Sequence, residues 1–284
     1  MKRSLKDMVV VITGSTGGLG VAAAKELRQQ GARLALLDLS HTAASEQAQS
    51  LGGADVAKGW AADVTSLSDL ETAMNAVARH FGKIDVVIAN AGVGFTEPMA
   101  TMTDATFTKT IDINLNGVWR TFKAAQPHVQ RSKGYLLAVS SMAAFVNAPL
   151  NAHYTASKAG VLAMCNSLRL EVRPQGVAVG TLHPTFFKTP MMDALMGNAC
   201  SELIFDSYRG IWKFVSLEAV VKALVNGIAS RHQLITVPGN NAIMARMTGL
   251  LRPLIDRFGF SDDRIAEAIQ RHQNDTHQAV ANDY

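Results

Sequence analysis

The segment Thr13-Gly14-Ser15-Thr16-Gly17-Gly18-Leu19-Gly20 decides how this chain folds. A short apolar run at 8–13 leads into it, and a helical pattern at 18–30 follows it. This order of strand, glycine-rich turn and helix allows the backbone to approach a pyrophosphate at the positive end of a helix. A structural tight turn is the alternative, but the strand-to-helix context favours a dinucleotide site. The candidate residues of that site are Gly14, Thr16, Gly18, Leu19 and Gly20.

Short β-branched runs alternate with longer helical stretches along the rest of the chain. Such alternation indicates βαβ units and a parallel sheet with helices on both faces. We predict an α/β protein: a single Rossmann-type doubly wound domain with a seven-stranded parallel sheet, followed by a C-terminal helical extension. The expected strands are 8–13, 33–38, 55–60, 84–90, 135–140, 177–182 and 234–237, and the expected helices are 18–30, 41–51, 67–81, 104–131, 153–173 and 216–229.

The predicted domain spans 1–239 and the predicted extension spans 240–284. Within the domain, 185–212 is rich in Phe, Met, Tyr and Trp but is broken by Pro190 and Gly197. This composition is typical of a loop that covers an apolar pocket, so we predict a substrate lid there.

Composition argues against several classes of function. The formal net charge of +4 comes from scattered Lys and Arg with no basic block, so nucleic acid is not an expected partner. Cys165 and Cys200 are too far apart for a CxxC motif and no His pair has metal-site spacing, so we expect buried thiols and no metal. No segment reaches the roughly 18 apolar residues of a spanning helix, and the N-terminal apolar run is too short for a signal peptide. We therefore expect a cytoplasmic protein.

Asp38 ends the second predicted strand, 18 residues after Gly20. An acid at this place can accept both hydroxyls of the adenosine ribose and repels a 2′-phosphate. No Arg or Lys stands at Ser15, Thr16 or Leu39 to bind such a phosphate. We therefore predict NAD rather than NADP as the cofactor, with strand-end capping as the alternative role of Asp38.

Tyr154 and Lys158 lie four residues apart on a predicted helix, so their side chains share one face. A phenol is a poor base on its own, because its ordinary pKa is about 10. The Lys158 ammonium and the positive ring of an oxidised nicotinamide would stabilise the phenolate in a partly dry site. Ser141, just after the fifth strand, could hold the substrate oxygen, with Ser140 as the neighbouring rival. A plain surface pair is the alternative for Tyr154 and Lys158, but the surrounding motifs favour catalysis.

These features resemble the short-chain dehydrogenase/reductase family over residues 6–239. The resemblance rests on motifs in the family's order and spacing: Thr-Gly-x-x-x-Gly-x-Gly at 13–20, Asp63-Val64, Ala89-Asn90-Ala91-Gly92, Asn114, Ser141 and Tyr154-x-x-x-Lys158. It implies a Rossmann-fold enzyme that transfers a hydride between an alcohol or ketone and nicotinamide. Two departures are visible, since Ala89 replaces the first Asn of the common Asn-Asn-Ala-Gly and Thr185 replaces the Gly that usually follows Pro184.

The resemblance also implies roles for further residues. Asp63 and Val64 would hold the adenine, Asn90 and Gly92 would support the cofactor beside the fourth strand, and Thr189 would contact the nicotinamide carboxamide. Asn114 would complete a catalytic tetrad with Ser141, Tyr154 and Lys158. In the family this Asn interrupts its helix and binds a water that links the Lys to solvent; a helix kink alone is the other interpretation of Asn114.

Mostly apolar residues are expected to border the substrate pocket. Such walls favour a hydrophobic secondary alcohol or ketone as substrate. Some of these residues could instead belong to the core, Met196 and Phe205 above all. The expected border comprises Phe95, Met142, Ala143, Ala144, Phe145, Val146, Phe186, Phe187, Met191, Met192, Leu195, Met196, Phe205, Tyr208 and Trp212.

The extension carries an apolar helical stripe, formed by Met244, Met247, Leu251, Leu254, Ile255 and Phe258. Arg246, Arg252 and Arg257 lie on the other side, and we expect a kink at Pro253. We favour packing of this stripe on its own domain or on a second subunit, with membrane-surface contact by 241–260 and a lid over the substrate as alternatives. By the resemblance, a homodimer would form through the helices at 104–131 and 153–173, or a homotetramer through the C-terminal edge as well.

Two other functions remain open at this point. An NADP-dependent 3-oxoacyl thioester reductase is one, although it would prefer NADP and a basic docking patch, and the position of Asp38 argues against it. A non-catalytic dinucleotide-binding member of the family is the other. Burial of the charged Lys158 side chain would destabilise the fold, and a protein without a catalytic role for this side chain would gain nothing from it. We therefore favour the enzyme.

Overall fold

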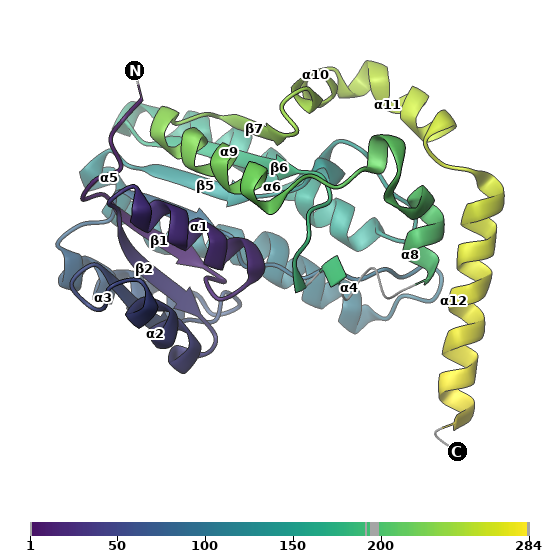
Figure 1. Cartoon of the computed structure of the whole chain (residues 1–284), viewed down its shortest axis with the longest axis horizontal. Coiled ribbons are helices and arrows are strands. Elements are labelled where there is room, and N and C mark those ends of the chain that lie inside the picture. Colours follow the sequence, from purple (N-terminus) through teal and green to yellow (C-terminus); the bar gives the residue numbers. More distant parts are fainter. Residues whose placement is uncertain (1, 191, 194–198, 283–284) are drawn as a thin grey trace.

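The computed structural model describes residues 2–190, 192–193 and 199–282. Seven parallel strands form one sheet in the order β3-β2-β1-β4-β5-β6-β7 (Figure 1). The predicted seven-stranded Rossmann-type sheet is confirmed, with strand boundaries within two residues of the expected ones. The strands are β1 (Val9–Thr13), β2 (Arg33–Asp38), β3 (Ala57–Ala61), β4 (Val86–Ala89), β5 (Tyr135–Val139), β6 (Ala178–Pro184) and β7 (Leu234–Val237).

Helices cover both faces of the sheet, which explains why its central strands are apolar at successive positions. Val9 and Val11 of β1 face a core shared with α3, α5 and α6, whereas Val10 and Ile12 face a core shared with α1 and α9. The helices beside the sheet are α1 (Gly18–Gln29), α2 (His41–Ser50), α3 (Leu67–Phe81), α4 (Asp104–Ile111), α5 (Gly117–Ser132), α6 (Ala152–Val172) and α9 (Leu217–Ser230). The hydroxyl of Ser66 accepts from the backbone N–H of Asp69 and caps α3.

The strand order places a ligand site between β1 and β4. From β1 the chain moves outward to β2 and β3, and then returns to the other side of β1 as β4. At this reversal the loops that follow β1 and β4 separate, and a crevice opens at the carboxyl ends of the strands. The glycine-rich turn follows β1 directly, so it lies at this crevice.

The helix expected at 104–131 is interrupted in the structure. Between α4 and α5 the backbone forms one π-helical turn, Asp112–Asn116, with the buried Asn114 at its centre. Such turns are rare and are often found at functional sites. The interruption implied by the family resemblance is therefore present.

The C-terminal third of the chain adds a smaller apolar cluster. Helix α8 (Ala199–Ile204) packs against the last helix, α12 (Asp262–Asn282), which runs along one side of the molecule (Figure 1). Phe186, Phe205, Tyr208 and Trp212 take part in this cluster from the segment predicted as a lid. The division of the chain at residue 239 and the lid itself stay predictions.

Two short helices, α10 (Asn241–Arg246) and α11 (Thr248–Phe258), connect β7 to α12. The break between them falls at Met247, whose backbone leaves the helical conformation, and α11 continues through position 253. The helices are thus interrupted at Met247, six residues before the kink that was expected at Pro253. Among the described residues, no helix is long and apolar enough to cross a membrane.

Candidate functional site

The glycine-rich turn brings backbone close to backbone at the start of α1. Gly14 has a φ of +62°, and a Cβ atom there would lie 2.8 Å from the Cα of Ala91 in the loop after β4. A side chain at Gly18 would likewise meet the side chain of Thr189. No side chain caps the first turn of α1 and no acidic residue lies in it. The turn is therefore a narrow cradle whose backbone N–H groups can bind an anion.

Asp38 lies at the end of β2 and faces the same crevice. One of its carboxylate oxygens accepts hydrogen bonds from the backbone N–H of Thr16 at 2.9 Å and from its hydroxyl at 2.8 Å, and the other accepts from the Leu39 N–H. These contacts fix the carboxylate beside the glycine-rich turn. Both expected roles of Asp38 are compatible with this geometry, since the acid ties the strand end to the turn and also lines the pocket.

Asn90 connects the loop after β4 to the turn after β1. Its amide donates to the carbonyls of Thr13 and Gly14 at 3.1 and 2.9 Å. Asp63 accepts the N–H of Thr65, and Asp63 lines the pocket. Asp38 and Asn90 thus connect the ends of β2 and β4 to the turn after β1, whereas the Asp63 contact stays within its own loop.

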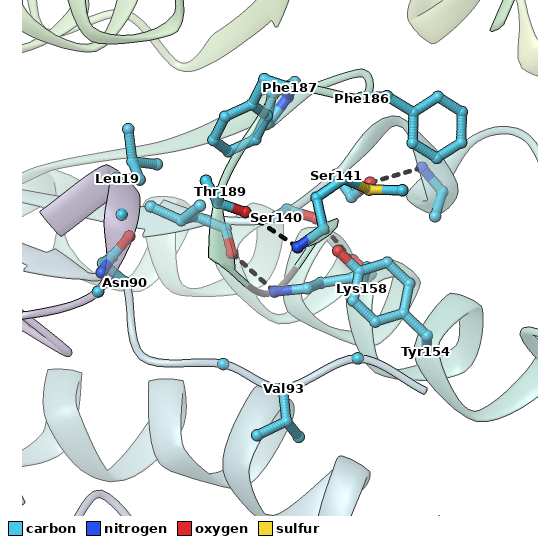
Figure 2. Close-up of a pocket in the computed structure, with 18 of the residues that line it drawn as sticks. Leu19, Asn90, Val93, Ser140, Ser141, Tyr154, Lys158, Phe186, Phe187 and Thr189 are labelled. Atoms are coloured by element: carbon cyan, nitrogen blue, oxygen red, sulfur yellow. Dashed lines mark hydrogen bonds between the residues drawn. The ribbon is translucent and has the colours of Figure 1, made fainter. Parts of the chain in front are cut away.

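Tyr154 and Lys158 project from α6 into the crevice (Figure 2). The Lys158 ammonium donates to the Val139 carbonyl at 3.0 Å and lies 5.5 Å from the ring centre of Tyr154. Burial lowers the pKa of Lys158 to about 8. Burial raises the pKa of Tyr154, and a hydrogen bond with Ser141 partly opposes that increase. The Lys158 ammonium therefore lies where it can stabilise a Tyr154 phenolate, the form of the side chain that accepts a proton.

The structure distinguishes Ser141 from its neighbour. The Ser140 hydroxyl is buried and donates to the Lys158 carbonyl at 3.0 Å, so it anchors α6 to β5. Both serines line the pocket, but it is the Ser141 side chain that hydrogen-bonds with Tyr154. Ser141 is therefore the serine that can reach a substrate oxygen beside Tyr154.

His183 supports the Ser141 loop from beneath. Because a carbonyl can only accept, the ring Nδ1–H donates to the Ser141 carbonyl at 3.0 Å, and Nε2 pairs with the Thr181 hydroxyl at 2.8 Å. Burial lowers the pKa of His183 to about 4, so the ring is neutral at physiological pH. The neutral ring therefore helps to hold the backbone at Ser141 in place.

Asn114 is fully buried behind the crevice. Its side-chain oxygen accepts from the Val93 N–H at 2.8 Å, and its amide donates to the Val93 carbonyl at 2.9 Å and to the Ser157 hydroxyl. It also lies next to Gly92, where an added Cβ would be 3.1 Å from the Asn114 oxygen. Asn114 does not line the pocket, so its contacts are with the loop after β4 and with α6.

One continuous pocket of about 770 Å³ joins these groups. Figure 2 shows Leu19 and Asn90 at one end of it and Tyr154, Ser141 and Phe186 at the other. Gly20 lies beneath the turn, outside the pocket, against the backbone of Gly14 and Ser15. The predicted site residues that line the pocket are Gly14, Thr16, Gly18, Leu19, Asp38, Asp63, Val64, Asn90, Gly92, Ser141, Tyr154, Lys158 and Thr189.

The pocket wall beyond Tyr154 is mostly apolar. Eight expected residues line it: Met142, Ala143, Val146, Phe186, Phe187, Met192, Phe205 and Trp212. Four expected residues are not in its lining, namely Phe95, Ala144, Phe145 and Tyr208. Met191, Leu195 and Met196 lie outside the described residues. The sequence did not indicate that Thr96, Asn151 and Ser201 line the pocket. Met244 and Ile255 also line it, although the sequence analysis predicted them only as members of the apolar helical stripe.

Comparison with known proteins agrees with this geometry. The family model described as short chain dehydrogenase matches residues 8–198. The chain belongs to the short-chain dehydrogenase/reductase family. This family consists of oxidoreductases that bind NAD(P), so the predicted family and its redox chemistry are confirmed at that level.

Several relatives of this short-chain dehydrogenase have names that mention a substrate. The human 3-hydroxyacyl-CoA dehydrogenase type-2 is 33% identical over 214 residues, covering 71% of this chain and 81% of the relative. A (-)-trans-carveol dehydrogenase of Rhodococcus erythropolis is 35% identical over 205 residues, covering 66% and 74%. The crystal structure of a 3-ketoacyl-(acyl-carrier-protein) reductase from Brucella melitensis complexed with NADH has a TM-score of 0.72 at 24% identity, covering 82% of this chain and 98% of that one. This last likeness concerns the fold alone.

Proposed function

We propose that this short-chain dehydrogenase transfers a hydride between NAD and a hydrophobic secondary alcohol or its ketone. The observation that carries the proposal is the continuous pocket, which joins the glycine-rich turn and Asp38 to Tyr154, Lys158 and an apolar wall. Such a pocket can hold a dinucleotide and a substrate at the same time.

The residues at the β1 end of the pocket fit NAD. Gly14, Thr16 and Gly18 line the pocket at the uncapped start of α1, where backbone N–H groups would bind a pyrophosphate. Thr16 orients the Asp38 carboxylate, which would accept the ribose hydroxyls and repel a 2′-phosphate. Asp63 and Val64 would hold the adenine, and Thr189 would contact the carboxamide.

The catalytic roles fall to Tyr154, Lys158, Ser141 and Asn114. When bound, a nicotinamide dinucleotide accepts or supplies the hydride. The Tyr154 oxygen takes the hydroxyl proton of an alcohol during oxidation and returns it to the carbonyl oxygen during reduction. The Lys158 ammonium stabilises the phenolate form, and the Ser141 hydroxyl donates to the substrate oxygen as charge develops there. Asn114 holds the loop at Val93 and would support a water that exchanges protons with Lys158.

The wall of the pocket favours an uncharged, apolar substrate. Met142, Phe186, Phe205 and Trp212 line it, and the carboxylates in its lining, Asp38 and Asp63, belong to the dinucleotide end. Removal of apolar substrate surface from water would supply affinity of about 25 cal/mol per Å². The carveol dehydrogenase relative has a cyclic secondary alcohol in its name, which supports the same class of substrate.

A 3-oxoacyl thioester reductase that uses NADP is the second candidate. The 33% identical relative named 3-hydroxyacyl-CoA dehydrogenase type-2 favours it. Carrier groups of such substrates bear phosphates, which need basic side chains. Among the described residues that line the pocket, Lys158 is the only Lys or Arg, and it belongs to the acid/base pair. We therefore rank this function second.

We also propose a homo-oligomer in the cytoplasm. Phe107 of α4, Trp119 of α5 and Leu170 of α6 are exposed apolar side chains on the helices predicted to form a dimer. Burying them in a dimer face would remove apolar surface from water. Static light scattering tests this proposal: a mass of at least two chains is expected, Trp119→Glu should lower it, and a monomeric wild type would contradict it.

The proposed reaction is tested by incubating the purified protein with NAD and a panel of bulky secondary alcohols at about pH 9, where loss of the hydroxyl proton is favoured. NADH formation with a matching ketone product is the expected result. Bound NAD without turnover of any alcohol would contradict the catalytic proposal. Turnover confined to NADPH and acyl thioesters would support the second candidate instead.

A further inference from the structure

The helices between β7 and α12 expose an unusually apolar face. Of the large hydrophobic side chains that are exposed in the described part of the chain, several lie together on α10 and α11. We call these residues the outer stripe: Ile243, Met247, Leu250, Leu254 and Phe258. Phe258 is 77% exposed and Leu250 is 66% exposed. Leu250, Leu254 and Phe258 follow one another at intervals of four residues, which places them along one side of α11.

Basic side chains border the outer stripe. Arg246 and Arg257 are exposed, and the guanidinium of Arg257 lies 5.5 Å from the ring centre of Phe258. Asp256 is the one carboxylate in the sequence between residues 240 and 260. Arg246 also lines a depression of about 650 Å³ together with Arg169 and His232. The exposed apolar face therefore has positively charged borders.

We propose that the outer stripe docks on the surface of a lipid bilayer that contains anionic lipids. An amphipathic helix with an apolar face and basic borders buries that face at the boundary between headgroups and acyl chains, and its cations attract anionic headgroups. Helix α11 has 11 residues, too few to span a bilayer, so the contact is with the surface.

A second copy of the chain fits this face less well. In a symmetric dimer the same patch meets itself, so Arg246 and Arg257 of both copies would gather around the interface. With Asp256 as the one carboxylate in this region, like charges would outnumber opposite ones there. An anionic bilayer accepts both the apolar side chains and the arginines. Figure 1 shows α10 and α11 along the outside of the fold, where a flat surface can reach them.

The docked helices would also form part of the pocket wall. Met244 of α10 and Ile255 of α11 line the large pocket, while their neighbours in the outer stripe face away from it. Docking would place this wall against the bilayer, where apolar alcohols accumulate. This last consequence rests on the proposed function, whereas the docking itself does not.

Sedimentation with lipid vesicles tests the docking without any turnover. The full chain is mixed with vesicles of phosphatidylcholine that contain about one quarter phosphatidylglycerol, and with vesicles of phosphatidylcholine alone. We expect binding to the anionic vesicles, at least about tenfold weaker binding to the neutral ones, and weakening by added salt. The combined variant Leu250→Gln, Leu254→Gln, Phe258→Gln should lower vesicle binding at least about tenfold.

Two further variants make this test decisive. Met99→Gln removes an apolar side chain elsewhere that is as exposed as Leu250, and it should leave vesicle binding unchanged. Circular dichroism shows whether the variant of the outer stripe folds. If it does not, the variant Arg246→Gln with Arg257→Gln tests the proposal instead, because it should weaken binding to anionic vesicles and leave binding to neutral vesicles unchanged. Absence of wild-type binding would overturn the proposal, and so would full binding to anionic vesicles by the variant of the outer stripe or by Arg246→Gln with Arg257→Gln. A fall in oligomeric mass for the variant of the outer stripe, with no vesicle binding by the wild type, would assign the face to a second copy.

Discussion

Replacement of the buried Lys158 by Met should change how the stability of the protein depends on pH. Lys158 is 5% exposed. Its pKa falls from 10.5 to about 8 on folding because burial disfavours the charged form. Between these two pH values the unfolded chain binds more protons at this residue than the folded one, so the free energy of unfolding of the wild type rises with pH. Met has a similar shape and no charge, so this contribution disappears in Lys158→Met.

The magnitude follows from the pKa difference. One pKa unit corresponds to about 1.4 kcal/mol, so the fall from 10.5 to about 8 amounts to about 3 kcal/mol. The wild type should therefore gain about 3 kcal/mol relative to Lys158→Met between about pH 8 and about pH 10.5. Loss of the hydrogen bond to the Val139 carbonyl shifts the difference between the proteins but adds little to its pH dependence above pH 8.

Urea unfolding of both proteins near pH 7.5 and pH 10.5 measures this difference. Deprotonation at high pH of the tyrosines other than Tyr154 affects both proteins and cancels in the comparison. Lys25→Met, which removes an exposed lysine of α1, serves as the matched control for loss of a positive charge. A difference between wild type and Lys158→Met that stays constant to within about 1 kcal/mol would refute the assigned burial of the ammonium. Turnover should be lost in Lys158→Met at every pH.

Further substitutions and pH changes test the remaining roles. Tyr154→Phe should abolish turnover and leave NAD affinity within about threefold in a titration; retained activity would refute the acid/base role. Because burial raises the pKa of Tyr154, oxidation rates should rise with pH and reduction rates should fall in initial-rate profiles. Asp38→Ala should raise the NADP to NAD ratio of kcat/KM at least about tenfold, and an unchanged ratio would count against the ribose contact. Ser141→Ala should lower kcat about a hundredfold, whereas Ser140→Ala should mainly cost about 1 kcal/mol of stability. Equal effects on kcat would contradict the distinction between the two serines.

Most strands were predictable because they are short, buried, apolar runs with a turn before or after them, such as Val9–Thr13 and Val86–Ala89. The ends of the strands were harder to predict, since a strand extends only as far as its pairing with a neighbouring strand. The third strand was expected at 55–60 and lies at Ala57–Ala61, because pairing begins where Leu34 meets Ala57. The π-helical turn around Asn114 depends on a contact with Val93, 21 residues away, which local periodicity does not contain.

The residues of the candidate site were recognisable from sequence motifs, but the role of each residue depends on its contacts in the folded structure. Ser140 and Ser141 are neighbours in the sequence, and their side-chain contacts separate them: Ser140 donates to the Lys158 carbonyl, whereas Ser141 hydrogen-bonds with Tyr154. The wall contributed by Met244 and Ile255 comes from about 90 to 100 residues beyond Tyr154, so no local pattern connects it to the pocket. The apolar stripe was visible, whereas its partial exposure required the structure.

A comparison of kcat/KM in one assay tests the central claim most directly: the best apolar secondary alcohol with NAD, the same alcohol with NADP, and a short 3-oxoacyl thioester with NADPH. The pocket that joins Asp38 to Tyr154 and an apolar wall predicts the highest value for the alcohol with NAD, at least about tenfold above the other two. A higher value for the thioester with NADPH would contradict both the cofactor and the substrate class proposed for this enzyme.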